Sequence, residues 1–182
     1  MKTLVLGGVR SGKSRHAESV AREAVGSTTV IATGTAGDEE MAARIAAHRA
    51  RRPAHWTVIE EPLHLSSALT RASNADSVII IDCLTLWLSN LLLHTNPRLL
   101  DNEVEGLIAT LPELPGSLIL VGNEVGFGIM PINDLARRFG DAAGLLHQRL
   151  AAACDQVVLM IAGLPLTVKG GGPDRPFLGI RQ

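Results

Sequence analysis

The fold of this chain is decided by the stretch Gly7-Gly8-Val9-Arg10-Ser11-Gly12-Lys13-Ser14, which matches the G-x-x-x-x-G-K-S pattern of a phosphate-binding P-loop. An apolar run at residues 3–6 precedes it and a helix-compatible run at residues 14–23 follows, in the order that the motif requires. Glycines let backbone N–H groups turn toward a phosphate, and the helix N-terminus adds a favourable dipole. We expect Lys13 to reach the β- and γ-phosphates of a nucleotide, and the Ser14 hydroxyl to hold Mg²⁺. The alternative, a glycine-rich turn with a chance lysine, is disfavoured by this order of strand, loop and helix.

Apolar, β-branched runs alternate with stretches of helical periodicity along the chain. The predicted strands are residues 3–6, 29–32, 57–60, 77–82, 117–122 and 156–161, and the predicted helices are residues 13–25, 38–51, 63–72, 85–93, 102–110 and 133–153. Strands separated by helices indicate right-handed crossovers and a mainly parallel sheet with helices on both faces. The sequence therefore predicts one three-layer α/β domain of the P-loop NTPase fold over residues 1–169. A flexible tail rich in glycine and proline is expected over residues 170–182.

Composition excludes several classes of protein. Of the 182 residues, 46% are hydrophobic and 19% are charged, which is typical of a globular chain and not of a disordered one. The formal net charge of −1 argues against a nucleic-acid-binding protein, which usually carries a basic stripe. Cys83 and Cys154 lie in apolar settings far apart in sequence, so we interpret them as reduced core residues of a cytoplasmic protein. We expect no signal peptide and no membrane span, because the apolar run at residues 84–93 is too short.

Asp82 is the second candidate site residue. It ends a run of four apolar residues, Val78-Ile79-Ile80-Ile81, that is expected to form a central strand buried on both faces. A carboxylate at the carboxyl end of a buried strand beside a P-loop can hold Mg²⁺, directly or through water. Aspartate is also a good N-cap, so capping of the next helix is the alternative. The P-loop upstream favours the metal role.

His48 is the third candidate, because it lies near the end of the predicted helix 38–51 among several arginines. Arg44 precedes it by one helical turn, and Arg49, Arg51 and Arg52 follow it. Positive charge around a histidine can bind polyphosphate and favours the neutral, nucleophilic imidazole. Arginines also suit the C-terminal end of a helix dipole, and from the pattern alone a solvated basic helix end is the preferred interpretation.

Several blocks of sequence occur in the order found in one known family. They are the P-loop extended by Arg15-His16-Ala17-Glu18, Met41-Ala42-Ala43-Arg44-Ile45 with His48, Arg52-Pro53-Ala54-His55-Trp56, Asn123-Glu124-Val125-Gly126-Phe127-Gly128-Ile129, Leu135-Ala136-Arg137-Arg138-Phe139 and Gln148-Arg149-Leu150-Ala151-Ala152. This chain resembles the bifunctional adenosylcobinamide kinase / adenosylcobinamide-phosphate guanylyltransferase family of cobalamin biosynthesis from about Leu4 to Lys169. The resemblance implies a RecA-like P-loop fold and a homotrimer. It also reverses the interpretation of His48, which matches the family histidine that becomes guanylylated.

The resemblance implies two reactions. First, ATP or GTP phosphorylates the hydroxyl of the aminopropanol arm of adenosylcobinamide. Second, the His48 imidazole attacks the α-phosphate of GTP, and the GMP then passes to adenosylcobinamide phosphate to give adenosylcobinamide-GDP. Mg²⁺ held by Ser14 and Asp82 would offset charge on the phosphate oxygens, with Lys13 and His48 as catalytic residues. The nucleotide-binding residues implied by the resemblance are Gly7, Gly8, Val9, Arg10, Ser11, Gly12, Lys13, Ser14, Ala32, Thr33, Gly34, Arg49, Ala50, Arg51, Arg52, Glu60 and Asp82.

The loop at residues 123–131 follows a predicted strand, and ligands in open parallel sheets bind outside the carboxyl ends of strands. We therefore expect this loop to face a cleft, with a purely structural turn as the alternative. Two other functions remain open: a P-loop small-molecule kinase without the guanylyl step, and a nucleotide-dependent regulatory switch. A switch requires an orienting glutamine or an arginine finger, and nothing in the sequence marks either.

Overall fold

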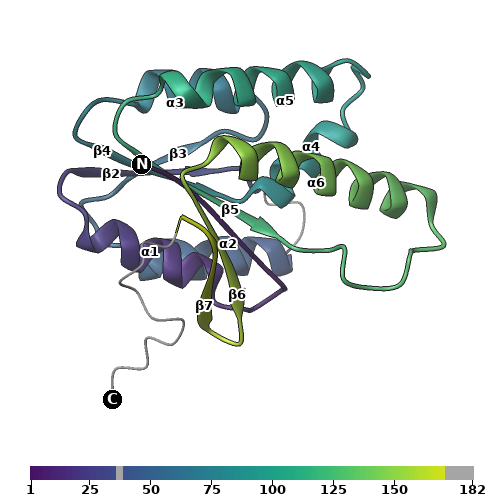
Figure 1. The fold of residues 1–182 in the computed structure, drawn as a ribbon, viewed down its shortest axis with the longest axis horizontal. Helices are drawn as coiled ribbons and strands as arrows, with labels where there is room; N and C mark the ends of the chain where they lie inside the picture. Colours follow the sequence, from purple (N-terminus) through teal and green to yellow (C-terminus); the bar gives the residue numbers. More distant parts are fainter. Residues whose placement is uncertain (36–38, 171–182) are drawn as a thin grey trace.

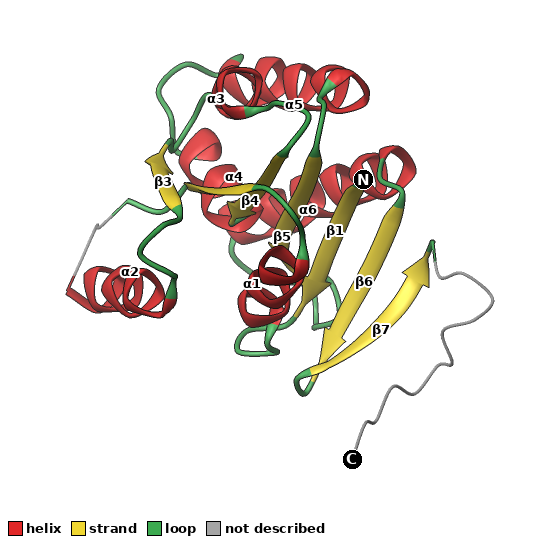
Figure 2. Ribbon diagram, turned by 90° about the vertical axis from the view of Figure 1, so that its left-hand side faces the viewer, coloured by secondary structure: helices red, strands yellow, loops and turns green. Residues whose placement is uncertain are grey.

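The chain folds into an open sheet with helices on both faces (Figures 1 and 2). A computed structural model describes residues 1–35 and 39–170, and for residues 40–42, 44, 45 and 48 it describes the backbone alone. Within these residues the sheet has seven strands in the order β3-β2-β4-β5-β1-β6-β7. The strands are β1 (Lys2–Gly7), β2 (Ser27–Ala32), β3 (Thr57–Glu60), β4 (Ser77–Asp82), β5 (Ser117–Asn123), β6 (Gln156–Ile161) and β7 (Leu164–Lys169). The pairings among β1 to β6 are all parallel, as expected from the alternation of strands and helices.

Helices connect the parallel strands and divide between the two faces of the sheet. They are α1 (Lys13–Glu23), α2 (Glu39–Arg51), α3 (Leu65–Ala72), α4 (Leu84–Leu92), α5 (Leu99–Thr110) and α6 (Asp134–Ala153), with a short 3₁₀ helix at Leu111–Glu113. Figure 2 shows α3, α4, α5 and α6 on one face, and α1 and α2 on the other. This three-layer arrangement with a mainly parallel sheet confirms the predicted P-loop NTPase fold.

Each face of the sheet has its own hydrophobic core, and β4 contributes to both. Ile79 and Ile81 pack toward α3 to α6, whereas Val78 and Ile80 pack toward α1. Successive side chains of a strand point to opposite faces, so a strand buried on both sides must be apolar throughout. The apolar run of β4 is continuous because its alternate side chains pack into two different cores.

The main error of the sequence prediction is β7, which was not expected. β7 pairs antiparallel with β6 at the edge of the sheet, after a turn at Ala162 and Gly163, both of which have positive φ. A two-residue turn of this kind is typical of a β-hairpin, and proline, here Pro165, is tolerated on an edge strand. Most of β7 is exposed, so it lacks the buried apolar run on which the other strands were recognised. Apart from Gly170, the predicted tail lies outside the described residues.

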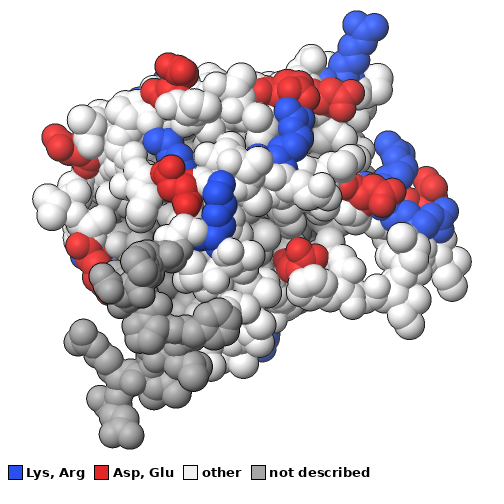
Figure 3. All heavy atoms as spheres, viewed as in Figure 1, with Lys and Arg blue, Asp and Glu red and all other residues white. Residues whose placement is uncertain are grey.

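The structure can also be compared with two predictions from composition, which concern the cysteines and membrane-spanning segments. Both cysteines are free, Cys154 being buried and Cys83 half-buried. No helix among the described residues is long and apolar enough to cross a membrane. On the face seen in Figure 3, the acidic and basic side chains of the described residues are interspersed, without a broad patch of either sign.

Candidate active site

The P-loop connects β1 to α1 and is built on left-handed backbone. Gly12, the N-cap of α1, has φ of 99°, and Gly7 has φ of 151°. A Cβ at Gly7 would lie 2.5 Å from the carbonyl oxygen of Met160 and 2.7 Å from Ser11 Oγ, which leaves no room for a side chain. No side chain of the described residues caps the N-terminus of α1. The first N–H groups of this helix are therefore available to a phosphate, as the motif requires.

The Lys13 side chain turns back toward the backbone of the P-loop. The Lys13 ammonium donates a hydrogen bond of 2.6 Å to the carbonyl oxygen of Gly8, and it lies 3.5 Å from Ser11 Oγ. Burial lowers the pKa of Lys13, and the electrostatic influence of Cys83 and Asp82 partly opposes this shift. An ammonium at this place lies close to any phosphate that the N–H groups of the loop bind.

Ser14 and Asp82, the two residues predicted to hold Mg²⁺, lie side by side. Ser14 Oγ donates a hydrogen bond of 3.2 Å to Asp82 Oδ1. Adjacent oxygen ligands of octahedral Mg²⁺ lie about 3.0 Å apart, given metal–oxygen distances of about 2.1 Å, so the spacing of this pair suits the ion. The described residues contain no cluster of three or more histidine, cysteine or acidic side chains that would form a complete metal site. Phosphate oxygens and water would have to supply the remaining ligands, which is the usual arrangement for Mg²⁺ in nucleotide sites.

The alternative role for Asp82, capping of the next helix, is not what the structure has. The N-cap of α4 is Cys83, and within the described part of the chain no side chain caps this helix. The second carboxylate oxygen of Asp82 instead accepts a hydrogen bond of 2.8 Å from Arg52 Nη2. Both side chains are nearly buried, at 11% exposure for Asp82 and 8% for Arg52. Asp82 therefore links the P-loop helix to the residue that directly follows α2.

Glu18 is a second acidic partner of the arginines, and sequence reasoning assigned it no role. This buried side chain of α1 has Oε1 3.6 Å from Arg51 Nη2 and 3.9 Å from Arg52 Nε. Neither Glu18 Oε1 nor Arg52 Nε has a hydrogen-bond partner among the described residues. The position of Glu18, four residues after Ser14 on the same helix, was the available signal.

The carboxyl ends of three neighbouring strands bring further predicted residues together. In the sheet register, Ala32 of β2 pairs with Glu60 of β3 on one side and with Asp82 of β4 on the other. Arg49 of α2 forms an ion pair of 2.5 Å with Glu60, and both side chains are largely exposed. Arg49, near the end of α2, and Arg52, just after it, thus contact Glu60 and Asp82, the two acidic residues that were predicted to contact nucleotide. His48 lies in the last turns of α2, one helical turn before Arg52, and its side chain is outside the described part of the chain.

Thr33 is fully buried and joins the ends of β2 and β4. Its hydroxyl donates to the carbonyl oxygen of Cys83 at 2.6 Å and accepts from the N–H of Cys83 at 2.9 Å. The Asn90 amide donates to the carbonyl oxygen of Thr33 at 2.8 Å and to that of Pro62 at 3.1 Å. Thr33 and Asn90 therefore fix the backbone around Asp82, and sequence reasoning did not identify Asn90.

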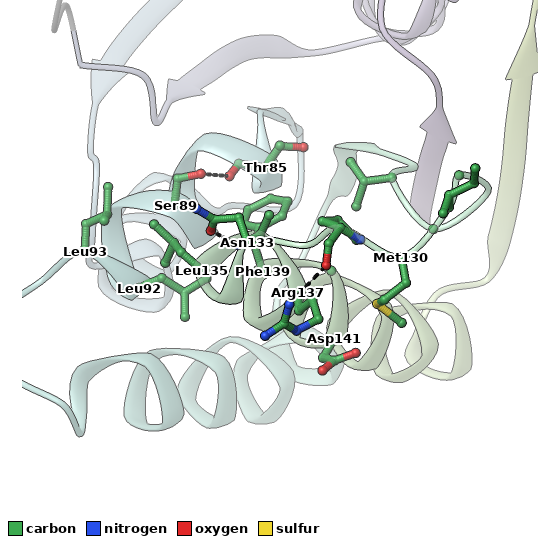
Figure 4. Close-up of a pocket in the computed structure, with 17 residues that line it drawn as sticks. Thr85, Ser89, Leu92, Leu93, Met130, Asn133, Leu135, Arg137, Phe139 and Asp141 are labelled. Atoms are coloured by element: carbon green, nitrogen blue, oxygen red, sulfur yellow. Dashed lines mark hydrogen bonds between the residues drawn. The ribbon is translucent and has the colours of Figure 1, made fainter.

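The loop after β5 lines a cavity of about 640 Å³, as expected (Figure 4). Residues 125, 126 and 128–131 form one wall, α4 contributes Leu92, and the first half of α6 contributes Leu135 and Phe139. The lining is mostly apolar. The loop is attached to the P-loop, because the N–H of Glu124 donates to the carbonyl oxygen of Gly7 at 2.9 Å. The apolar cavity and the phosphate loop are therefore neighbours at the same edge of the sheet.

Comparison with known proteins shows which family the chain belongs to. Residues 3–168 match the family described as cobinamide kinase / cobinamide phosphate guanyltransferase. The chain belongs to this family. It is 53% identical over 170 residues to the bifunctional adenosylcobalamin biosynthesis protein CobP of Pseudomonas aeruginosa, with 93% of this chain and 98% of the relative covered. It is 43% identical over 182 residues to CobU of Salmonella typhimurium, with 93% and 100% covered.

Family membership confirms the resemblance and the bifunctional activity predicted from the sequence. The protein is a cobinamide kinase and cobinamide-phosphate guanylyltransferase of adenosylcobalamin biosynthesis, and it uses nucleoside triphosphates. Among solved structures, a Pyrococcus horikoshii protein superposes with a TM-score of 0.56 at 8% identity, covering 94% of this chain and 87% of that one. That likeness concerns the fold alone. The roles of individual site residues stay predictions.

Proposed function

We propose that the enzyme phosphorylates the aminopropanol hydroxyl of adenosylcobinamide with ATP or GTP, and then transfers GMP from GTP through His48 to adenosylcobinamide phosphate. One observation carries this proposal: Asp82 contacts Ser14 of the P-loop helix with one oxygen and Arg52, one helical turn after His48, with the other. The residues expected at the β- and γ-phosphates and the helix that carries the expected nucleophile thus belong to one connected site.

In the kinase step, the protein mainly positions the reactants and neutralises charge. The free N–H groups of the P-loop and the Lys13 ammonium hold the β- and γ-phosphates. Mg²⁺ held by Ser14 and Asp82 would offset the charge that develops on the phosphate oxygens. The acceptor hydroxyl attacks the γ-phosphorus, and the bond between this phosphorus and the bridging oxygen of the nucleoside diphosphate breaks.

In the guanylyl step, the chain supplies the nucleophile. A neutral ring nitrogen of His48 attacks the α-phosphorus of GTP, a P–N bond forms, and pyrophosphate leaves. A phosphate oxygen of adenosylcobinamide phosphate then attacks the same phosphorus, the P–N bond breaks, and His48 returns to its starting state. Arg49 and Arg51 follow His48 on α2, and their guanidinium groups would stabilise negative charge on the phosphates.

The proposal extends to a homotrimer that works in the cytoplasm, where nucleoside triphosphates are present. The family resemblance supports the trimer. Two large apolar side chains of the loop before α6, Phe127 and Ile132, are 83% and 98% exposed in the single chain. Apolar groups exposed to this degree gain stability when another subunit covers them. Light scattering should give three times the mass of the chain, and a monomer would contradict this part of the proposal.

Labelling with GTP tests the guanylyl step and separates it from the kinase-only alternative. GTP carrying the label on its α-phosphate should attach label to the wild-type protein, in a bond that is acid-labile and alkali-stable like a phosphoramidate. His48→Ala should lose the label and keep kinase activity, because phosphoryl transfer needs no protein nucleophile. The control His55→Ala should retain the label. An unlabelled wild type would favour the simple kinase, and full labelling of His48→Ala would refute the assignment.

A further inference from the structure

One glutamate that neither reaction has used follows β5, where the chain passes from the P-loop to the apolar cavity. Glu124 is the first residue after β5, and its neighbour in the chain, Val125, lines the cavity. The last residue of β5, Asn123, pairs with Gly7 in the sheet register, and the N–H of Glu124 donates to the carbonyl oxygen of Gly7. The backbone of Glu124 is thus hydrogen-bonded to Gly7, the first residue of the P-loop, and the next residue, Val125, lines the cavity.

The surroundings of Glu124 orient its carboxylate without neutralising it. Oε1 accepts a hydrogen bond of 2.6 Å from the N–H of Gly126, and Oε2 lies 3.9 Å from Nδ1 of His147. The side chain is only 19% exposed. Asp82 and Glu60, the acids at the ends of β4 and β3, each have an arginine at 2.8 Å or less. Glu124 has no arginine or lysine partner among the described residues, so no fixed cation competes for its carboxylate.

His147 of α6 lies next to the Glu124 carboxylate and restricts its position. It is a buried side chain, and its Nε2 would lie 3.0 Å from a Cβ at Gly122, so the imidazole packs against β5 where only glycine leaves room. Burial lowers the pKa of His147, with the Glu124 charge acting in the opposite direction. A neutral, packed imidazole restricts the Glu124 side chain without forming a full ion pair with it.

We propose that Glu124 is the general base of the kinase step, that His147 is its positioning residue, and that the acceptor hydroxyl enters from the apolar cavity. This inference rests on the proposed function. The acceptor O–H bond breaks as the oxygen forms its bond to the γ-phosphorus, and the proton goes to the Glu124 carboxylate. The P–O bond to the nucleoside diphosphate breaks, and its electron pair stays on that leaving group. The proton then passes to solvent when the product leaves.

Glu124→Gln tests the base role, since glutamine keeps the shape and the hydrogen bond to the N–H of Gly126 but accepts no proton. With cobinamide and ATP, kcat should fall by about 10² to 10⁴, the usual contribution of a general base, with KM for ATP within about threefold. Attachment of GMP from labelled GTP should continue at the wild-type rate. The control Glu105→Gln, on an exposed glutamate paired with Arg149, should leave both reactions unchanged.

His147→Asn tests the positioning role. It should lower kcat of the kinase reaction by about tenfold and leave KM for ATP in place, and it should have no further effect when Glu124→Gln is already present. A kcat within threefold of wild type in Glu124→Gln would overturn the base role, as would equal loss of both reactions. An effect of His147→Asn that persists in the double variant would overturn the positioning role. A failure of the proposed function would already appear in the wild type, which is the reference for both tests.

Discussion

Replacing Asp82 with asparagine removes one charge from a buried ion pair and keeps the shape of the side chain. Arg52 Nη2 lies 2.8 Å from Asp82 Oδ2, and the Arg52 side chain is 8% exposed. Removing one partner of a buried pair costs about 3–5 kcal/mol, because the remaining charge is left without compensation. Among the described residues, Glu18 remains as an acidic neighbour at 3.9 Å from Arg52 Nε. We therefore expect a loss near the lower limit, about 3 kcal/mol.

The measurement is urea unfolding of the protein without nucleotide, so that ligand binding does not enter the result. For a chain of this size, the loss corresponds to a fall in Tm of about 6–12 °C. Arg52→Gln and the double variant complete a thermodynamic cycle, in which the two losses should couple by about 1–3 kcal/mol. Glu105→Gln breaks an exposed pair of similar length, 2.7 Å, and should leave the unfolding midpoint nearly unchanged.

Two outcomes of this thermodynamic cycle would contradict a stabilising role for the Asp82–Arg52 ion pair. If Asp82→Asn changes stability as little as Glu105→Gln does, the Asp82–Arg52 pair contributes nothing to the fold. If the two single losses add without coupling, the residues act independently, and the link between the P-loop helix and α2 has no energetic basis.

Four further predictions concern the P-loop, His147 and the C-terminal tail. Lys13→Ala should lower the rates of both reactions by about 10² to 10³, and near-normal turnover would mean that the motif is structural here. Gly7→Ala should weaken ATP binding and lower Tm, because its Cβ would lie 2.5 Å from a backbone carbonyl; a Gly8→Ala control, where a Cβ meets nothing within 4 Å, should keep its Tm. Burial lowers the pKa of His147, so the unfolded chain takes up a proton that the folded chain excludes, and stability should fall as the pH drops below about 6.5; His147→Gln should flatten this acid limb in urea titrations. A chain ending at Lys169 should fold and transfer GMP, and loss of either property would show that the tail is required.

The parts of the site that the sequence predicted are those set by local pattern and by sheet geometry. The P-loop is contiguous, so its backbone conformation follows from its glycines. Ser14 and Asp82 were expected together because the carboxyl ends of parallel strands meet at one edge of the sheet. The ion pair between Arg52 and Asp82 joins residues from separate crossovers, and no periodicity encodes it. The buried state of Glu18 and His147 depends likewise on which helices cover which face, and β7 was missed because an exposed edge strand carries no core pattern.

The two reactions act on different phosphorus atoms, and the structure indicates how one site can serve both. Asp82 contacts the P-loop helix through Ser14, and it contacts Arg52, the residue after α2, so we expect it to contribute to both steps. His48 and Glu124 lie on different elements, α2 and the loop after β5, and each is assigned to a single step. Substitution of Asp82 should therefore impair both reactions, whereas substitutions of His48 and Glu124 should separate them in opposite directions. A variant of either residue that lost both activities equally would contradict this division of the site.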